Sequence, residues 1–348
     1  MDDRARASLT LLEGRVGAVA SHVAALLASP PAPPTALADA EDVTVTGVGA
    51  AAGPARHLAA LLAARRRARF VPVSTFAHGA GSARGTLVLF SQHLSPNAKL
   101  VLARAGDAAR IVLVTAASAP EIEAATDPAI RARLEIVPHA PQEERGTLLR
   151  VTGPAVATVV AVLLARSADV HVDDAALARL PDILRDAPAR FARVTEGTRV
   201  ASAWERPLAV VTAGELGHTA RAVAWKLLEG LAVAEPPAWD VLEIAHGPFQ
   251  QFFAREMCLV ALATPADRPL LDRLSAMLAP DRHALLVLPS ELPPALAPVE
   301  HDALANELVL AGLRARPRDL ARWDGQGLDG PLYELGATPE GGLSRSGA

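Results

Sequence analysis

The stretch Asp42-Val-Thr-Val-Thr-Gly-Val-Gly-Ala-Ala-Ala-Gly-Pro54 decides the fold class of this chain. Its first six residues predict a buried strand that ends in a turn. A helix is predicted directly after the turn, over residues 53–69. A strand that runs through a glycine-rich turn into a helix is typical of α/β proteins with a parallel sheet.

The same alternation continues along the chain. Further strands are predicted over 70–74, 85–90, 109–115, 134–138, 208–212, 240–244, 258–263 and 284–288. Helices are predicted over 7–27, 95–105, 152–164, 173–191, 219–231 and 269–278. Strands that alternate with helices indicate parallel sheets covered on both faces. The predicted fold is α/β, with two doubly wound parallel-sheet lobes that resemble the halves of an internal duplication.

Proline runs and changes in polarity divide the chain into five segments. The predicted segments are an N-terminal helix with a proline-rich linker (1–36), a first lobe (37–172), a helical connection (173–200), a second lobe (201–330) and a tail (331–348). The proline run at 30–34 ends the first helix because proline removes a backbone donor.

Composition excludes several classes of protein. The 348 residues are 51% hydrophobic with a net charge of −4, which disfavours a generally basic nucleic-acid-binding protein. A single cysteine, Cys258, excludes an internal disulfide framework and a cysteine-based zinc cluster, and it fits a reducing cytoplasm. No uncharged apolar run reaches about 18 residues, so neither a membrane span nor a membrane partner is expected.

Ligands of parallel α/β sheets bind beyond the carboxyl ends of the strands, where two polar segments of the first lobe fall. Gly47 and Gly49 lie in the turn after the first strand and can bring backbone amides close to an anion, although a tight structural turn explains them equally well. The second segment follows the strand over 85–90, and its candidate ligand-binding residues are Ser91, Gln92, His93, Ser95 and Asn97. Capping of the next helix alone would explain Ser95.

The second lobe contains the residues suited to acid–base chemistry. Lys226 and Glu229 are three residues apart and therefore share one face of a predicted helix. A surface ion pair is the simpler interpretation, but the neighbouring side chains are apolar, and a partly buried glutamate can exchange protons near neutral pH. Lys226 is one of only two lysines in the chain, with Lys99. The sequence Glu243-Ile-Ala-His-Gly-Pro248 follows.

Two lobes, a Ser-Gln loop after a strand, Lys-x-x-Glu and Glu-x-x-His-Gly-Pro together resemble the sugar isomerase (SIS) family. The arrangement is most similar to the tandem-SIS isomerase module of glucosamine-6-phosphate synthase and its deaminase and deglycase relatives. The resemblance spans roughly residues 40–330. It implies a cofactor-independent enzyme that binds a small sugar or sugar phosphate. No metal is expected either, because the histidines show no metal-ligand spacing.

The resemblance also implies a role for each matching residue. Glu229 matches the glutamate that moves a proton between C1 and C2 through an enediol-type intermediate. His246 matches the ring-opening histidine that reaches the site of a neighbouring subunit, which implies a homodimer. Lys226 matches the lysine beside the glutamate. Ser91 and Gln92 match the start of the phosphate-binding loop.

Several positions depart from the family pattern. Ala50 and Ala51 lie where the family pattern has a serine. His93-Leu94 lies where the family's phosphate loop has Ser-Gly. One possibility is a sugar phosphate held by the remaining loop groups, with His93 or Arg150 adding positive charge. The other is an unphosphorylated polyol or amino sugar.

Two functions from different classes follow. The first is an aldose–ketose isomerase, or a related amino-sugar deaminase or deglycase. The alternative is a catalytically silent SIS protein that binds a sugar ligand and regulates a partner, because fold alone does not determine activity.

Overall fold

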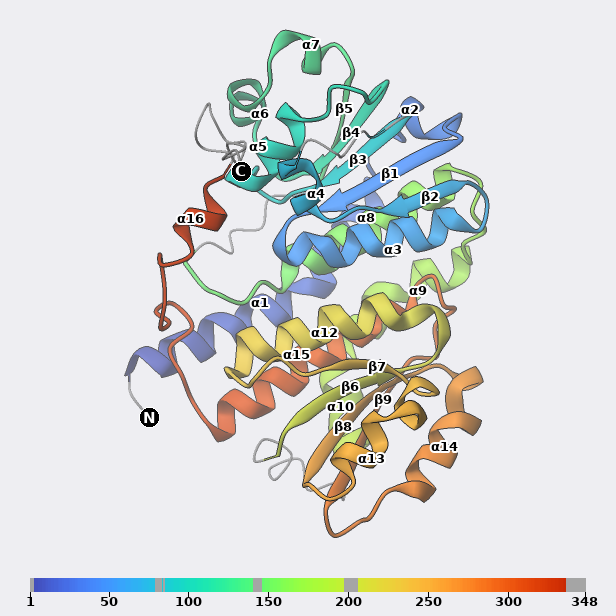
Figure 1. The fold of residues 1–348 in the computed structure, drawn as a ribbon, viewed down its shortest axis with the longest axis vertical. Helices are drawn as coiled ribbons and strands as arrows, with labels where there is room; N and C mark the ends of the chain where they lie inside the picture. Colours follow the sequence, from blue (N-terminus) through green and yellow to red (C-terminus); the bar gives the residue numbers. More distant parts are fainter. Residues whose placement is uncertain (1–2, 79–82, 84, 140–145, 197–205, 336–348) are drawn as a thin grey trace, which may run out of the picture. The chain divides into compact units, whose positions relative to one another are not determined.

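The computed structural model describes residues 3–78, 83, 85–139, 146–196 and 206–335 (Figure 1). The chain forms two compact units. The first-sheet unit comprises Ala25–Glu143, Val156–Val172 and Asp324–Ala348. The second-sheet unit comprises Met1–Ala24, Glu144–Ala155 and Asp173–Trp323.

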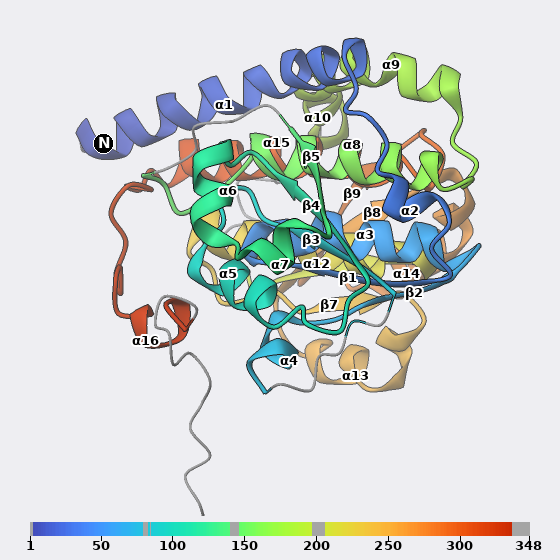
Figure 2. The ribbon, with the colours of Figure 1, turned by 90° about the horizontal axis from the view of Figure 1, so that it is seen from above.

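A five-stranded parallel sheet forms the centre of the first-sheet unit, with strand order β2-β1-β3-β4-β5 (Figure 2). Its strands are β1 (Asp42–Gly47), β2 (Arg67–Phe70), β3 (Thr86–Phe90), β4 (Arg110–Thr115) and β5 (Leu134–Pro138). Every residue of the central strand β3 is buried, which is why it is a continuous apolar run. Leu87 and Leu89 of β3 pack on one face of the sheet with residues of α5 (Pro96–Ala103) and α6 (Ala119–Ala125).

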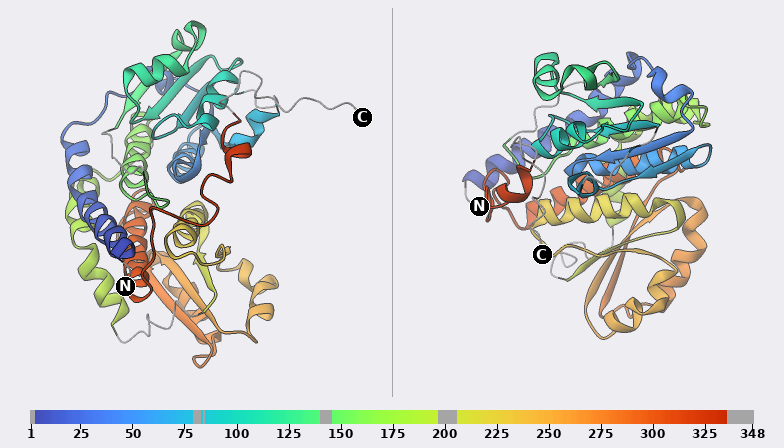
Figure 3. Two further views of the ribbon diagram at one scale, coloured as in Figure 1. Left: turned by 90° about the vertical axis from the view of Figure 1, so that its left-hand side faces the viewer. Right: turned by 45° about the horizontal axis from the view of Figure 1, so that its top comes forward.

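A four-stranded parallel sheet forms the centre of the second-sheet unit, with strand order β7-β6-β8-β9. Its strands are β6 (Leu208–Thr212), β7 (Ala238–Asp240), β8 (Met257–Ala263) and β9 (His283–Pro289). Successive side chains of a strand point to opposite faces, and two separate cores result. Figure 3 shows α12 (Gly217–Leu231) and α14 (Arg268–Met277) on opposite sides of this sheet.

The two cores divide the residues of the central strands between them. Cys258, Val260 and Leu262 pack against α12 and the long helix α15 (Ala297–Ala315). Leu259 and Ala261 instead pack with residues of α14 and α13 (Pro248–Phe252). The two parallel sheets confirm the predicted fold class.

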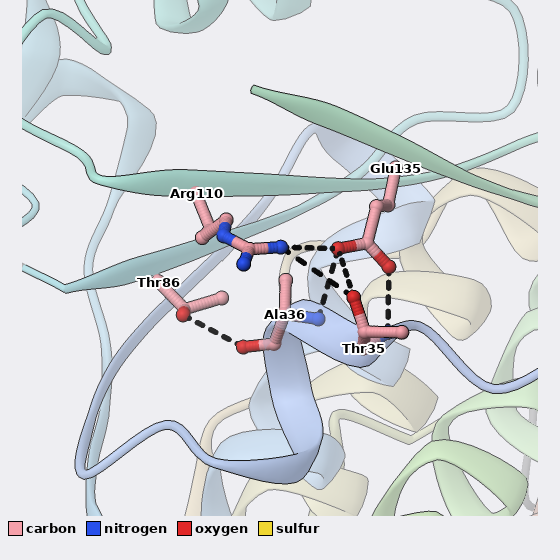
Figure 4. A network of polar contacts seen from close by, with 5 residues as sticks. All are labelled: Thr35, Ala36, Thr86, Arg110 and Glu135. Carbon is pink, nitrogen blue, oxygen red and sulfur yellow. Dashed lines mark hydrogen bonds and ion pairs between the residues drawn. The ribbon is translucent and has the colours of Figure 1, made fainter. Parts of the chain in front are cut away.

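A polar network fixes the chain that follows the proline-rich linker (Figure 4). The Glu135 carboxylate accepts hydrogen bonds from the Thr35 and Ala36 backbone amides at 2.6 and 2.9 Å, and it pairs with Arg110 at 3.1 Å. The Thr86 hydroxyl donates to the Ala36 carbonyl at 2.9 Å. The carboxylate thus satisfies free amides of the short helix α2 (Thr35–Ala38) and ties it to the starts of three strands. This network is therefore structural, because ligands of such sheets bind at the opposite strand ends.

Two predicted elements near the first turn are wrong. The helix expected over 53–69 is α3 (Ala52–Ala63), and the strand expected over 70–74 is β2, followed by the helix α4 (Val73–Ala77). Arg66 explains the early helix end, because its guanidinium donates to the carbonyls of Ala38 and Ala40 at 2.9 and 3.0 Å. These bonds hold the arginine run in a turn that leads into β2.

Three differences lie in or before the second sheet. The helix expected over 173–191 is two helices, α9 (Asp174–Arg185) and α10 (Ala187–Thr195). The strand expected over 240–244 ends at Asp240, whose carboxylate accepts the Leu242 amide at 2.8 Å and so begins a turn. The helix α15 was not expected at all.

The structure also describes the long N-terminal helix α1 (Asp3–Ala28). Within the described ranges it is the one helix that length and composition would allow to cross a membrane, with a mean hydropathy of 1.3 over 18 residues. Core helices of folded domains pass the same test, and Leu12 of α1 packs into the core of the second-sheet unit. Composition is therefore weak evidence for a membrane span here.

Candidate functional site

The predicted ligand loop follows β3 and is anchored to the end of β4. Ser91 is buried, and its backbone amide donates to the Val114 carbonyl at 3.0 Å. The Gln92 carbonyl accepts the Ala116 amide at 3.0 Å and the Thr115 hydroxyl at 3.3 Å. The backbone at the start of the loop is thus fixed, which is what a preformed binding loop requires.

Three side chains of this loop keep polar atoms that are buried and have no hydrogen-bond partner among the described residues. The atoms are His93 Nε2, Ser95 Oγ and Asn97 Oδ1. Ser95 occupies the N-cap of α5, yet its hydroxyl makes no capping bond, so capping does not account for it. Leu94 adopts φ +48°, a costly conformation for leucine that is typical of functional loops. Buried polar groups normally have partners; a bound anion could accept from the histidine and the serine, and a bound hydroxyl could donate to Asn97 Oδ1.

The glycine turn after β1 is explained by packing and backbone geometry. A Cβ on Gly47 would lie 2.4 Å from the Ala51 carbonyl oxygen, so only glycine fits at this position. Gly49 has φ +56° and begins the 3₁₀ turn η1 (Gly49–Ala51) ahead of α3. Both glycines are thus required by the turn itself.

Lys226 lies on α12, and its ammonium binds residues of α15. The side chain is only 6% exposed, and Nζ lies 2.5 Å from Asp302 Oδ1 and 2.5 Å from Asn306 Oδ1. Lys226 therefore forms its ion pair with Asp302, so the simple Lys226–Glu229 surface pair does not describe it.

Glu229 lies one helical turn beyond Lys226 and is partly buried. Burial raises the pKa of its carboxyl group from 4.5 to about 7, against the positive charges of Lys226 and Arg150, which lower it. A carboxyl group with a pKa near 7 populates both protonation states at neutral pH. That property suits a residue that must both accept and donate a proton.

Arg150 lies in the second-sheet unit, on the segment that precedes α8 (Thr152–Ser167). Its guanidinium is near enough to Glu229 for its charge to lower the carboxyl pKa. The structure thus places the Arg150 charge close to the acid–base residue of its own unit, and its role as a substitute phosphate ligand stays a prediction.

His246 ends the 3₁₀ turn η3 (Glu243–His246), and its side chain is exposed. Gly247 follows with φ +133°, a conformation that favours glycine. Asp240 supports this turn, because one carboxylate oxygen accepts the Leu242 amide and the other accepts the Gly214 amide at 3.1 Å. Asp240 thereby joins the His246 turn to the glycine turn after β6.

Sequence reasoning missed Asp302 and Asn306, which hold Lys226, and Asp240. The signal for the first two was present. Asp302 and Asn306 are four residues apart, which places them on one face of a helix.

A cavity of about 890 Å³ lies elsewhere in the second-sheet unit, between α9, α10 and the loops after β8 and β9. Arg179 and Arg190 line it, but none of the predicted site residues does. The described residues contain no group of three or more His, Cys, Asp or Glu side chains able to hold a metal. Burial raises the pKa of the Cys258 thiol to about 12, so it is not a nucleophile at neutral pH.

Comparison with known proteins gives matches among solved structures. No protein-family model and no curated protein sequence matches the chain. A Silicibacter pomeroyi protein described provisionally as a phosphosugar isomerase has a TM-score of 0.70 at 17% identity, over 88% of this chain and 98% of that chain.

Two further structures give similar values. The C-terminal domain of glucosamine-fructose-6-phosphate aminotransferase from Francisella tularensis has a TM-score of 0.64 at 14% identity, over 88% of this chain and 95% of that chain. Glucosamine-6-phosphate deaminase from Thermotoga maritima has a TM-score of 0.62 at 13% identity, over 90% of this chain and 93% of that chain. The chain therefore has the fold of these sugar-phosphate isomerase and deaminase structures, as the SIS resemblance predicted.

Proposed function

We propose that the protein is an aldose–ketose isomerase, or a related amino-sugar deaminase or deglycase, that acts on a small sugar phosphate. The observation that carries the proposal is the partly buried Glu229 with a pKa of about 7. The three solved structures support it, because their names place sugar phosphates on this fold.

In this proposal Glu229 is the general base. With an aldose, its carboxylate takes the proton from C2 and later returns a proton to C1, while the hydroxyl proton of O2 moves to O1. The intermediate is an enediolate, and the Lys226 charge stabilises it electrostatically. With a 2-amino sugar the same transfer gives an imine at C2, which water hydrolyses to the ketose and ammonia.

The loop from Ser91 to Asn97 is assigned the binding of the sugar phosphate. The free His93 Nε2 and Ser95 Oγ atoms can donate to phosphate oxygens, and Asn97 Oδ1 can accept from a sugar hydroxyl, which supports this assignment. Hydrogen bonds to a charged group contribute about 1.5–3 kcal/mol each, so the remaining groups can replace lost serines.

His246 is assigned to ring opening in a homodimer, acting at the site of the second copy. Its exposed side chain supports this role, as do two large apolar residues nearby in the sequence, Leu242 and Phe253, which are 60% and 42% exposed.

The test follows, by NMR in deuterated water, the C2 proton of glucosamine 6-phosphate and the C1 protons of fructose 6-phosphate, with the unphosphorylated sugars measured alongside. Wild type is expected to exchange the proton. Glu229→Gln should exchange the proton about 10²–10⁴-fold more slowly than wild type, with sugar binding nearly unchanged. Glu235→Gln, which replaces an exposed carboxylate just beyond α12, is the control and should exchange at the wild-type rate. Full exchange in Glu229→Gln would refute the assignment of the base.

A sugar-binding protein without catalysis is the second candidate. The alanines at 50 and 51 favour it, because η1 offers no side-chain hydroxyl where family members have a serine. Calorimetry separates the two candidates. Binding of a sugar phosphate without any C2 exchange would support this second function and contradict the first.

A further inference from the structure

The contact between α12 and α15 is close and specific. A Cβ on Gly230 of α12 would lie 2.6 Å from Val309 Cγ1 of α15, so glycine permits the approach of the two helices. At this contact the buried Lys226 ammonium meets Asp302 and Asn306, which are one helical turn apart on α15. Asn306 is 1% exposed and the Asp302 side chain 17%.

Burial of a lysine normally favours its neutral form, because desolvation penalises the charge. Here two oxygen atoms accept from the ammonium, and one of them belongs to a carboxylate. Such a pair fixes the position and the direction of a side chain that is otherwise long and flexible.

We propose that Asp302 and Asn306 are positioning residues for proton transfer, because they hold the Lys226 ammonium in a fixed place beside Glu229. The inference rests on the proposed role of Glu229. It goes beyond that role by assigning the support of the site to α15.

Two positive charges act on the Glu229 carboxyl group, and a negative charge on α15 pairs with one of them. Lys226 lies on α12 itself, Arg150 lies on the segment before α8, and Asp302 on α15 neutralises part of the Lys226 charge. Loss of the Asp302 charge leaves the Lys226 charge uncompensated. The carboxylate form of Glu229 is then favoured, and its proton affinity falls.

The first measurement reads the lysine directly and needs no substrate. Because the chain has only two lysines, ¹⁵N-lysine labelling of the full-length protein gives two ammonium signals, and Lys99→Arg assigns them. The Lys226 ammonium should exchange its protons more slowly than the exposed Lys99. Asp302→Asn and Asn306→Leu should speed this exchange, whereas Asn306→Asp keeps an acceptor and should restore slow exchange.

The second measurement is the pH profile of C2-proton exchange. Asp302→Asn should lower kcat with little change in KM, and should move the midpoint of the profile down by about one pH unit. Asp272→Asn is the control, because it also removes one negative charge and breaks an ion pair in the same unit. That pair, with Arg268, is exposed, so kcat and the midpoint should stay at the wild-type values.

The two readouts separate the failure of this inference from the failure of the proposed function. Slow Lys226 exchange that is lost in Asp302→Asn supports the held ammonium even if no sugar reacts, in which case only the proposed reaction fails. Fast exchange in wild type, or an unchanged pH midpoint in an active Asp302→Asn, overturns the inference. The wild-type exchange rate remains decisive if Asp302→Asn does not fold.

Discussion

The two sheets begin with the same local plan. In the first-sheet unit β1 leads through η1 into α3, and in the second-sheet unit β6 leads through the 3₁₀ turn η2 (Gly214–Leu216) into α12. Gly49 and Gly214 each begin the 3₁₀ turn, and both have φ +56°. This shared plan supports an internal duplication more strongly than the weak residue identity does.

The helices that follow these turns differ in chemistry. Counted from the first residue of each helix, Leu61 of α3 corresponds to Lys226 of α12. The position that corresponds to Glu229 falls on Ala64, beyond the end of α3. Of these two helices, only α12 carries a lysine and a glutamate at the corresponding positions.

The turns after β3 and β8 also differ, in whether their polar side chains find partners. After β8, the Thr264 hydroxyl and amide both bind Asp267 Oδ2 at 2.8 Å, so the turn satisfies its own polar groups. After β3, the His93, Ser95 and Asn97 side chains each keep an unpartnered buried atom. This difference supports the proposed assignment of ligand binding to the loop after β3.

The largest expected effect tests how closely each helix approaches its strand. Gly47 ends β1, and Thr212 holds the same place at the end of β6. Gly47→Ala should lower the free energy of unfolding by about 3 kcal/mol, because the new Cβ would overlap the backbone of Ala51. Chemical denaturation measures the loss.

The matched control for this prediction is Thr212→Ala. It should cost about 1 kcal/mol or less, because the buried Thr212 hydroxyl has no hydrogen-bond partner among the described residues. Equal losses in the two variants would show that the glycine turns do not differ in packing.

The next effect tests the charged pair through pH. The pKa of Glu229 is about 7 in the folded chain and 4.5 ordinarily, so between these values the folded state keeps a proton that the unfolded state has lost. The free energy of unfolding therefore falls as pH rises through this window.

Glu229→Gln lacks this titration. Between pH 4 and pH 8 its free energy of unfolding should therefore rise by about 2 kcal/mol relative to that of wild type, allowing for the partial exposure of Glu229. Denaturation at several pH values measures the gain, with Glu235→Gln as the control that follows wild type. A constant difference between wild type and Glu229→Gln would contradict the raised pKa.

Sequence patterns predicted the strands well because buried parallel strands are short apolar runs. Asp42–Gly47, Leu134–Pro138 and Leu208–Thr212 have the predicted bounds. Two of the errors lie where a side chain overrides the local pattern, as Arg66 does after α3 and Asp240 does after β7.

The candidate site was only partly accessible to sequence reasoning. Lys226 and Glu229 share a helix, so spacing alone placed them together. The partners of Lys226 are distant in sequence, and only the packing of α12 on α15 reveals them. The free atoms of the Ser91–Asn97 loop were equally inaccessible, because the absence of a cap at Ser95 is a property of geometry and not of residue type.

The smallest expected effect compares Ser95 in the loop after β3 with Thr264 in the turn after β8. Ser95→Ala should weaken binding of a sugar phosphate about tenfold, the loss of one hydrogen bond to a charged group, with little change in stability. Thr264→Ala should do the reverse, because it removes a cap worth about 1 kcal/mol and no ligand contact. Calorimetric binding with glucosamine 6-phosphate and denaturation of both variants measure the two quantities. If Ser95→Ala lost stability as Thr264→Ala does and kept its affinity, the two loops would be equivalent caps, and the assignment of ligand binding to the loop after β3 would fail.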